Sequence, residues 1–143
     1  MLQTPILVHC GLSWVPSGLA GLANPLLLEP AIQSFPNVNF VLAHFAWPWV
    51  SEALMLAIKY PNVCLDTAIL YSGTPQDALQ HVLDQQVGLN VIERSLARQI
   101  VFGTNYPRVD IRRSVRGLRA LDFSDATMSA IFEGNARRLL RME

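Results

Sequence analysis

The chain has 143 residues, and its 11 basic and 11 acidic residues give a formal net charge of zero at pH 7. A neutral chain has no general electrostatic attraction for nucleic acid or for an anionic membrane surface, so we expect neither as a partner. Charged residues make up only 15% of the chain and hydrophobic residues 51%. The length predicts one domain, residues 1–143, and the hydrophobic excess predicts a large apolar surface buried in a core or an interface.

Neither a membrane span nor a secretion signal is expected. No apolar run reaches the roughly 18 residues that a transmembrane helix needs, and the first residues lack the basic segment and apolar stretch of a signal peptide. We therefore expect a cytoplasmic protein. Cys10 and Cys64 both lie in apolar runs, which favours reduced thiols in or near the core over a disulfide.

Four short apolar runs, at residues 5–10, 38–44, 62–67 and 99–102, are typical of buried strands. Residues typical of helix starts occur at three positions outside these runs: Asn24 before Pro25, Thr74 before Pro75, and Ser124. Helices are expected at about 24–35, 51–60, 74–86, 90–98, 111–121, 124–133 and 136–142, with a break at 134–135. Strands that alternate with helices predict an α/β fold with a parallel sheet and right-handed crossovers.

Each predicted strand has a polar residue near its carboxyl end: His9, His44, Asp66 and Asn105. In a parallel sheet these ends lie on one side, so the four side chains can converge. Singly, a histidine here can be a structural hydrogen-bonding residue, and Asp66 can anchor a turn. Two histidines at equivalent positions also suit a functional site, because imidazole binds metals and carries protons near pH 7. His81, in the middle of a predicted helix, is expected to be a surface or packing residue.

Two further groups leave alternatives open. Trp14, Trp47, Trp49 and Tyr106 follow strands, where they can wall a pocket for an aromatic or unsaturated acid or fill the gap beneath the helices. Five arginines fall within residues 108–119, either as an anion-facing cluster or as a solvated helix face. The chain has no HExxH, CxxC, P-loop, GxGxxG or GxSxG motif, which argues against nucleotide binding, zincin and serine-hydrolase chemistry.

Six segments taken together resemble the amidohydrolase-related family of metal-dependent TIM-barrel hydrolases and decarboxylases. They are residues 5–11, 35–44, 47–48, 60–67, 101–107 and 134–140, in order along the chain. Similar members include aminocarboxymuconate-semialdehyde decarboxylase and dicarboxylate lactonases. The resemblance covers strands five to eight, so it implies a C-terminal half of a (β/α)8 barrel. The HxH metal-binding pair of the family's first strand does not occur in this sequence.

The resemblance also implies roles for individual residues. His9 would be the fifth-strand metal ligand, and His44 the sixth-strand histidine that binds metal or moves a proton. Asn105 stands at the catalytic position where the family usually has an aspartate, and Trp47 and Arg108 would contact the substrate. The implied cofactor is a divalent metal, zinc first, with manganese or iron as alternatives. An amide cannot accept a proton near neutral pH, and an imidazole with an amide is a small ligand set for zinc.

The function implied is hydrolysis or decarboxylation of a small carboxylated substrate, which could be aromatic. The alternative is a non-catalytic, truncated half-barrel that serves as a binding or assembly module. Four parallel strands cannot close a barrel, so two sheet edges and an apolar inner face should stay uncovered. We therefore expect a homo-oligomer or pairing with an N-terminal half-barrel, with an open layer that folds alone as the other option.

Overall fold

The computed structural model describes residues 4–69, 71 and 73–142. Its centre is one parallel sheet in the order β1-β2-β3-β4, formed by β1 (Ile6–Val8), β2 (Phe40–Leu42), β3 (Val63–Asp66) and β4 (Ile100–Val101). Ile6 lies opposite Phe40, Phe40 opposite Val63, and Leu65 opposite Ile100. Each strand lies inside one of the four predicted apolar runs, so the α/β class with a parallel sheet is confirmed.

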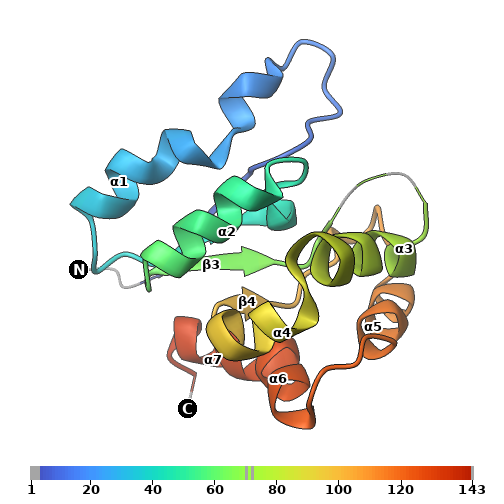
Figure 1. Ribbon diagram of the computed structural model, residues 1–143. Coiled ribbons are helices and arrows are strands. Elements are labelled where there is room, and N and C mark those ends of the chain that lie inside the picture. The colour runs from blue at the N-terminus through green and yellow to red at the C-terminus, as the bar shows by residue number, and fades with distance from the viewer. Residues whose placement is uncertain (1–3, 70, 72, 143) are drawn as a thin grey trace.

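Helices fill the intervals between the strands (Figure 1). The α-helices are α1 (Glu29–Ser34), α2 (Val50–Lys59), α3 (Pro75–Leu79), α4 (Leu89–Val91), α5 (Ile111–Arg119), α6 (Asp125–Ser129) and α7 (Asn135–Leu140). The 3-10 helices are η1 (Ala20–Ala23), η2 (Pro25–Leu28) and η3 (Ala43–Ala46), and the wider π-helical segments are η4 (Gln80–Val87), η5 (Ile92–Leu96) and η6 (Ala130–Gly134).

The three predicted helix starts are capped by the expected side chains. Asn24 accepts the Leu26 N–H, and Ser124 accepts the Thr127 N–H. Thr74 and Asp77 form a reciprocal capping box, in which each side chain accepts the other residue's backbone N–H. Such caps satisfy backbone donors that the first helical turn leaves free.

The predicted break at 134–135 is wrong. Gly134 and Asn135 both have helical dihedral angles, and α6, η6 and α7 follow one another without a gap. The reason lies in the Asn135 side chain, which is only 1% exposed and donates to the carbonyl oxygens of Ala97 at 2.8 Å and Ile100 at 2.7 Å. This asparagine therefore fastens the helix to the start of β4 instead of ending it.

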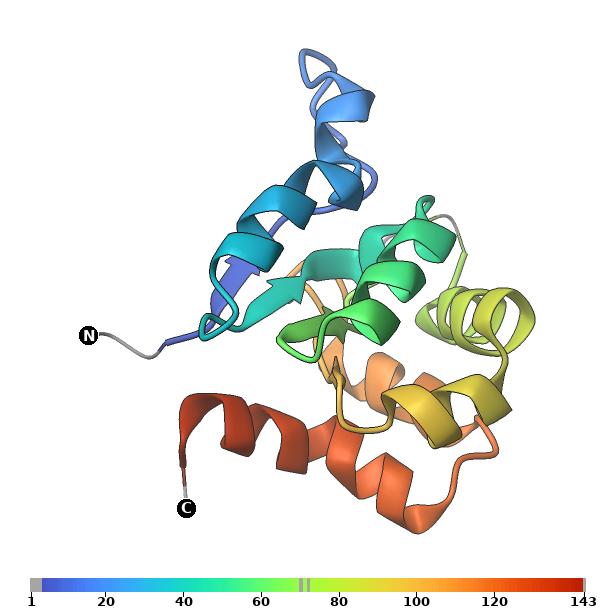
Figure 2. The same ribbon diagram turned by 60° about the vertical axis from the view of Figure 1, so that its left-hand side comes forward.

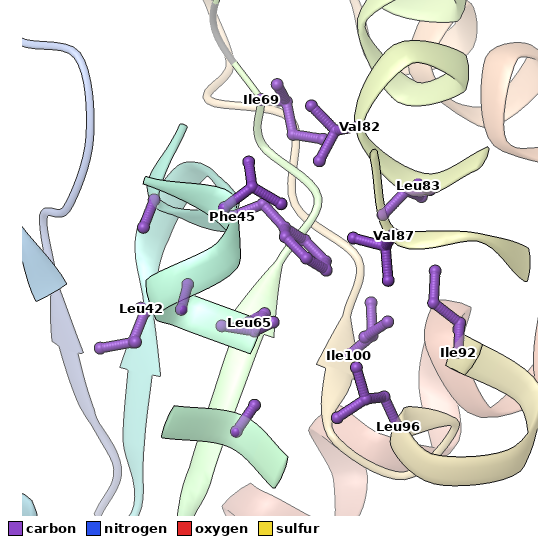
Figure 3. Close-up of a cluster of buried hydrophobic side chains, with 14 of the residues drawn as sticks. Leu42, Phe45, Leu65, Ile69, Val82, Leu83, Val87, Ile92, Leu96 and Ile100 are labelled. Atoms are coloured by element: carbon purple, nitrogen blue, oxygen red, sulfur yellow. The ribbon is translucent and has the colours of Figure 1, made fainter. Parts of the chain in front are cut away.

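The main core lies between one face of the sheet and the helices (Figure 3). Strand residues Leu42, Leu65 and Ile100 are fully buried there against side chains of α2, η4 and η5, among them Leu56, Leu83, Val87, Ile92 and Leu96. The strands read as continuous apolar runs because a parallel sheet is covered on both faces.

The opposite face carries a smaller cluster, formed by Val41, Cys64 and Val101 with Leu139 of α7. The sequence predicted an uncovered inner face. The prediction holds for Leu7 of β1, which is 65% exposed, but not for Val41, Cys64 and Val101, which are buried with Leu139 of α7 packed against them. Cys10 and Cys64 are free and buried, as predicted, and burial raises the pKa of each thiol to about 11.

In the segment from residue 11 to 35, the part around η1 projects from the rest of the molecule (Figure 2), whereas η2 contacts α2 and Ile32 of α1 is buried. Much of the segment's apolar surface is uncovered, including Trp14, Leu19, Leu22, Leu27 and Phe35. Among the described residues, none of the helices combines the length and the hydrophobicity that a membrane span requires.

Candidate active site

The four polar residues predicted at the strand ends come together in the structure. His9, His44, Asp66 and Asn105 line one cleft of about 590 Å³, whose wall also includes the apolar side chains of Leu7, Val41, Val101 and Phe102. The cleft opens at the carboxyl ends of the strands, because all four strands run in the same direction. The parallel topology thus gathers residues that lie as far as 96 positions apart in sequence.

The His44 ring is held in one tautomer. Its Nδ1 lies 2.6 Å from the carbonyl oxygen of Ala68, and because a carbonyl oxygen only accepts, Nδ1 carries the hydrogen and donates it. In the neutral ring Nε2 then holds the free lone pair. This Nε2 lies 3.2 Å from Nδ1 of His9, so the two imidazoles form a hydrogen-bonded pair at the cleft.

The main chain that carries His44 is strained. His44, Phe45 and Ala46 all have left-handed φ angles, of 63°, 48° and 51°, and each such residue costs about 1–2 kcal/mol when it is not glycine. The surroundings offset this cost. Phe45 and Ala46 are fully buried, and the His44 carbonyl accepts the Trp47 N–H at 3.0 Å. Strain held in this way is common at functional sites.

Asp66 ties β3 to this segment. Its Oδ1 accepts the backbone N–H of His44 at 2.7 Å and that of Ala68 at 3.0 Å. Burial raises the pKa of the Asp66 carboxyl, and the two backbone donors counteract part of that effect. The sequence allowed Asp66 to be either a turn anchor or a functional group of the site. The geometry matches the turn anchor, because the carboxylate accepts a hydrogen bond from the main chain two residues ahead.

His9 and Asn105 stand on the outer two of the four strand ends. His9 is exposed, and desolvation together with the neighbouring His44 lowers the pKa of its imidazole. Asn105 is also exposed and has a left-handed φ of 57°, a conformation that asparagine tolerates well. Its carbonyl accepts the Arg108 N–H at 3.0 Å, which turns the chain away from the cleft.

The described residues do not make a complete metal site by themselves. Zinc takes three or four protein ligands, and no group of three His, Cys, Asp or Glu side chains that could hold a metal ion occurs in residues 4–69, 71 and 73–142. His9 and His44 supply two imidazoles, Asp66 Oδ1 is engaged by two backbone donors, and the Asn105 amide carries no charge. No chemical step below is assigned to a metal.

Trp47 and Arg108, the predicted substrate contacts, do not line this cleft. The Trp47 ring packs against the main core and stacks on Tyr71, with ring centroids 4.9 Å apart. Arg108 lines a separate cavity of about 400 Å³ on the far side of the same loops. His81 lies outside both cavities and bonds Gln85 and Gln86.

One part of the site had no signal in the sequence. The carbonyl of Ala68, which fixes the His44 tautomer, belongs to a residue with no polar side chain. Every residue type offers a backbone carbonyl, so only the tertiary structure identifies the one that His44 meets.

Comparison with known proteins assigns the family. The family model described as "Amidohydrolase" matches residues 2–142. Protein fluG of Emericella nidulans is 35% identical over 83 residues, which are 58% of this chain and 10% of that protein.

Solved structures share the fold. The uncharacterized TIM-barrel protein Bb4693 from Bordetella bronchiseptica has a TM-score of 0.79 at 26% identity, over 97% of this chain and 46% of that one. The 2,6-dihydroxybenzoate decarboxylase from Rhizobium has a TM-score of 0.56 at 18% identity, over 90% and 44%. This chain thus spans a little under half the length of these structures. It belongs to the amidohydrolase family, and its fold corresponds to about half of a TIM barrel.

Proposed function

We propose that this chain carries the His9–His44 cleft of an amidohydrolase-type hydrolase or decarboxylase that acts on a small carboxylated compound. The observation that carries the proposal is the fixed tautomer of His44, whose Nε2 lone pair accepts a hydrogen bond from His9 Nδ1 at the cleft. The name of the dihydroxybenzoate decarboxylase that shares the fold supports a carboxylated aromatic ring as the substrate class.

Both reactions need a group that holds and moves a proton near neutral pH. In decarboxylation the bond between the ring carbon and the carboxylate breaks, CO2 leaves, and the electron pair left on the carbon takes up a proton. In hydrolysis an attacking water loses one. An imidazole suits either task. His9 can relay a proton to His44 by donating from Nδ1 to His44 Nε2, 3.2 Å away, while its own Nε2 takes up a proton from solvent. Asn105 can orient a substrate by hydrogen bonding, although its amide cannot act as a base.

A divalent metal belongs to the proposal as a group that needs ligands beyond the described residues. His9 would be this chain's ligand while His44 moves the proton, or both histidines would bind the ion if His44 serves as a ligand instead. Zinc, manganese or iron would be the ion. A structure of dihydroxybenzoic acid decarboxylase from Polaromonas with bound manganese shares the fold at 18% identity and a TM-score of 0.58.

The test is turnover of a panel of hydroxybenzoates and small lactones by the purified chain with added Mn2+ or Zn2+, followed as released CO2 or hydrolysed product. His44→Gln should lower the rate by about a hundredfold or more, which is the usual contribution of a general acid or base. His81→Gln removes a histidine outside the cleft and should leave the rate unchanged. Turnover that survives His44→Gln would overturn the assignment.

A second candidate is a non-catalytic half-barrel that acts as an assembly module, and an asymmetry between the sheet edges favours it. The outer edge of β4 is covered, because Phe102 N–H bonds the Ile131 carbonyl and Asn135 bonds the Ile100 carbonyl. The β1 edge has no neighbouring strand among the described residues, and Leu7 of β1 is 65% exposed. The occupant would be a second copy or an N-terminal half-barrel.

Sedimentation velocity at micromolar concentration tests this candidate. Leu7→Glu should weaken self-association or pairing with an added N-terminal half, whereas Leu140→Glu, on the exposed side of α7, should not. A well-behaved monomer that pairs with neither a second copy nor an added half would contradict it. Absence of turnover together with stable assembly would favour the module over the enzyme.

A further inference from the structure

The cavity that contains Arg108 is a second candidate binding site, separate from the histidine cleft. It is about 400 Å³ in volume and its wall includes Ile69, Tyr71, Thr74, Tyr106, Arg108 and Arg113. The two spaces share their dividing loops: Ala68 and Asn105 line the cleft, and the next residue in each loop lines this cavity. An adjoining hollow shares Thr74 and Arg113 and adds Arg116. We call the two together the arginine groove, defined by Thr74, Tyr106, Arg108, Arg113 and Arg116.

Positive charge exceeds negative charge in the lining of the arginine groove. Among the described residues, the guanidinium groups of Arg108, Arg113 and Arg116 form no hydrogen bond or ion pair with a carboxylate. Asp110 is the acidic residue in the lining, and its Oδ1 accepts the Arg113 backbone N–H at 2.9 Å as the cap of α5. Nearby Asp77 is engaged by Thr74. Three arginines without a carboxylate partner thus line the groove, with one capping carboxylate beside them.

We propose that the arginine groove binds an oxyanion, either the carboxylate or the phosphate group of a small ligand, with Arg113 at its centre. A guanidinium group presents a planar fork of donors that matches carboxylate and phosphate oxygens, and Arg113 lines both hollows. Tyr106 is 69% exposed and offers a ring beside the anion. The inference concerns binding alone, so it stands or falls independently of the proposed reaction.

The competing explanation is that the arginines of α5 form a solvated face without a ligand. Two neighbouring arginines of α5 distinguish this explanation from a binding site. Arg112 neighbours Arg113, has the same charge and is also exposed, but it lines a different hollow, which shares Arg116 with the groove and contains neither Arg108 nor Tyr106. Arg119 lies over the Phe132 ring instead. General electrostatic attraction would treat Arg112 and Arg113 alike, whereas a built site depends on Arg113.

The experiment is a titration of the full chain at constant ionic strength with inorganic phosphate, benzoate and neutral benzamide, followed by NMR chemical shifts of residues 69–78 and 106–116. Arg113→Gln should weaken anion binding by about tenfold, the loss expected for a charge-assisted hydrogen bond, and Arg112→Gln should change it less than twofold. Arg116→Gln gives a second loss of binding. Substituting these exposed side chains leaves the N-terminal cap of α5 intact, because the cap uses the backbone N–H of Arg113.

The anion arms identify the ligand class. Saturable binding of phosphate alone indicates a phosphorylated ligand, and binding of benzoate alone indicates a carboxylate. Either result supports the site if Arg113→Gln weakens that binding by about tenfold. The proposal is overturned if neither anion saturates, if benzamide binds as well as benzoate, or if Arg112→Gln and Arg113→Gln weaken binding equally.

Discussion

The His44 side chain donates a hydrogen bond from Nδ1 to the main-chain carbonyl oxygen of Ala68, at a distance of 2.6 Å. Asp66 holds both partners, because its Oδ1 accepts the backbone N–H of each. The carboxylate, the imidazole and the loop after β3 therefore form one closed arrangement. The direction in which His44 presents Nε2 follows from this arrangement, not from the side chain alone.

Replacing Asp66 tests that arrangement. Asp66→Asn keeps an oxygen acceptor and should leave stability at pH 7 unchanged or slightly higher, whereas Asp66→Ala leaves two buried N–H groups unpaired and should cost about 2–4 kcal/mol. The pKa of the Asp66 carboxyl is raised in the folded state. Its proton-linked contribution to the free energy of unfolding is therefore present below the ordinary aspartate pKa and is lost as pH rises through the raised pKa. Urea denaturation across pH measures both effects, and equal losses in the two variants would contradict the acceptor role.

The His9 pKa should report on its neighbour. Desolvation and His44 lower it from 6.5, so the unfolded chain takes up this proton first as pH falls. The stability contribution is then present above the ordinary histidine pKa and is lost as pH falls through it toward the lowered value. His44→Gln should raise the His9 pKa part of the way back, and His81→Gln should not. An NMR titration of the His9 ring measures this pKa. An unchanged His9 pKa in His44→Gln would show that His44 does not affect the titration of His9.

Asn135 should contribute strongly to stability although it lies outside both cavities. Asn135→Ala removes the donor that serves the Ala97 and Ile100 carbonyls and should cost about 2–3 kcal/mol, since buried acceptors are left unpaired. Asn90→Ala, at an exposed helix position, should cost less than about 0.5 kcal/mol. Chemical denaturation compares the two, and similar losses would show that Asn135 is not the fastening point of β4.

Asn105→Asp should strengthen binding of Zn2+ or Mn2+ by about an order of magnitude, because a charged carboxylate replaces a neutral amide as a third ligand near His9 and His44. Calorimetric titration with each metal measures the change, with Asn90→Asp as the control for added charge elsewhere. Unchanged affinity would mean that the Asn105 side chain does not reach the space beside the imidazoles.

Local patterns in the chain were sufficient to predict most of the scaffold. The apolar runs around Val41, Leu65 and Ile100 predicted the strands, because buried parallel strands need apolar residues on both faces. Thr74 and Ser124 marked helix starts through short-range hydrogen bonds to residues three positions on. The pair Gly134 and Asn135 predicts a break that the structure does not show. An asparagine beside a glycine often ends a helix, and the hydrogen bonds that keep this one helical reach residues 35 and 38 positions away.

By itself the sequence determined the order of strands and helices, the family, and the presence of His9, His44, Asp66 and Asn105 at strand ends. These depend on residue type and spacing, which are local properties of the chain. Only the tertiary structure decided that His44 donates to Ala68, that Asp66 serves the main chain, and that Arg108 and Arg113 share a cavity apart from the histidines. Those relationships join segments brought together by packing, and the partners include backbone atoms that every residue shares.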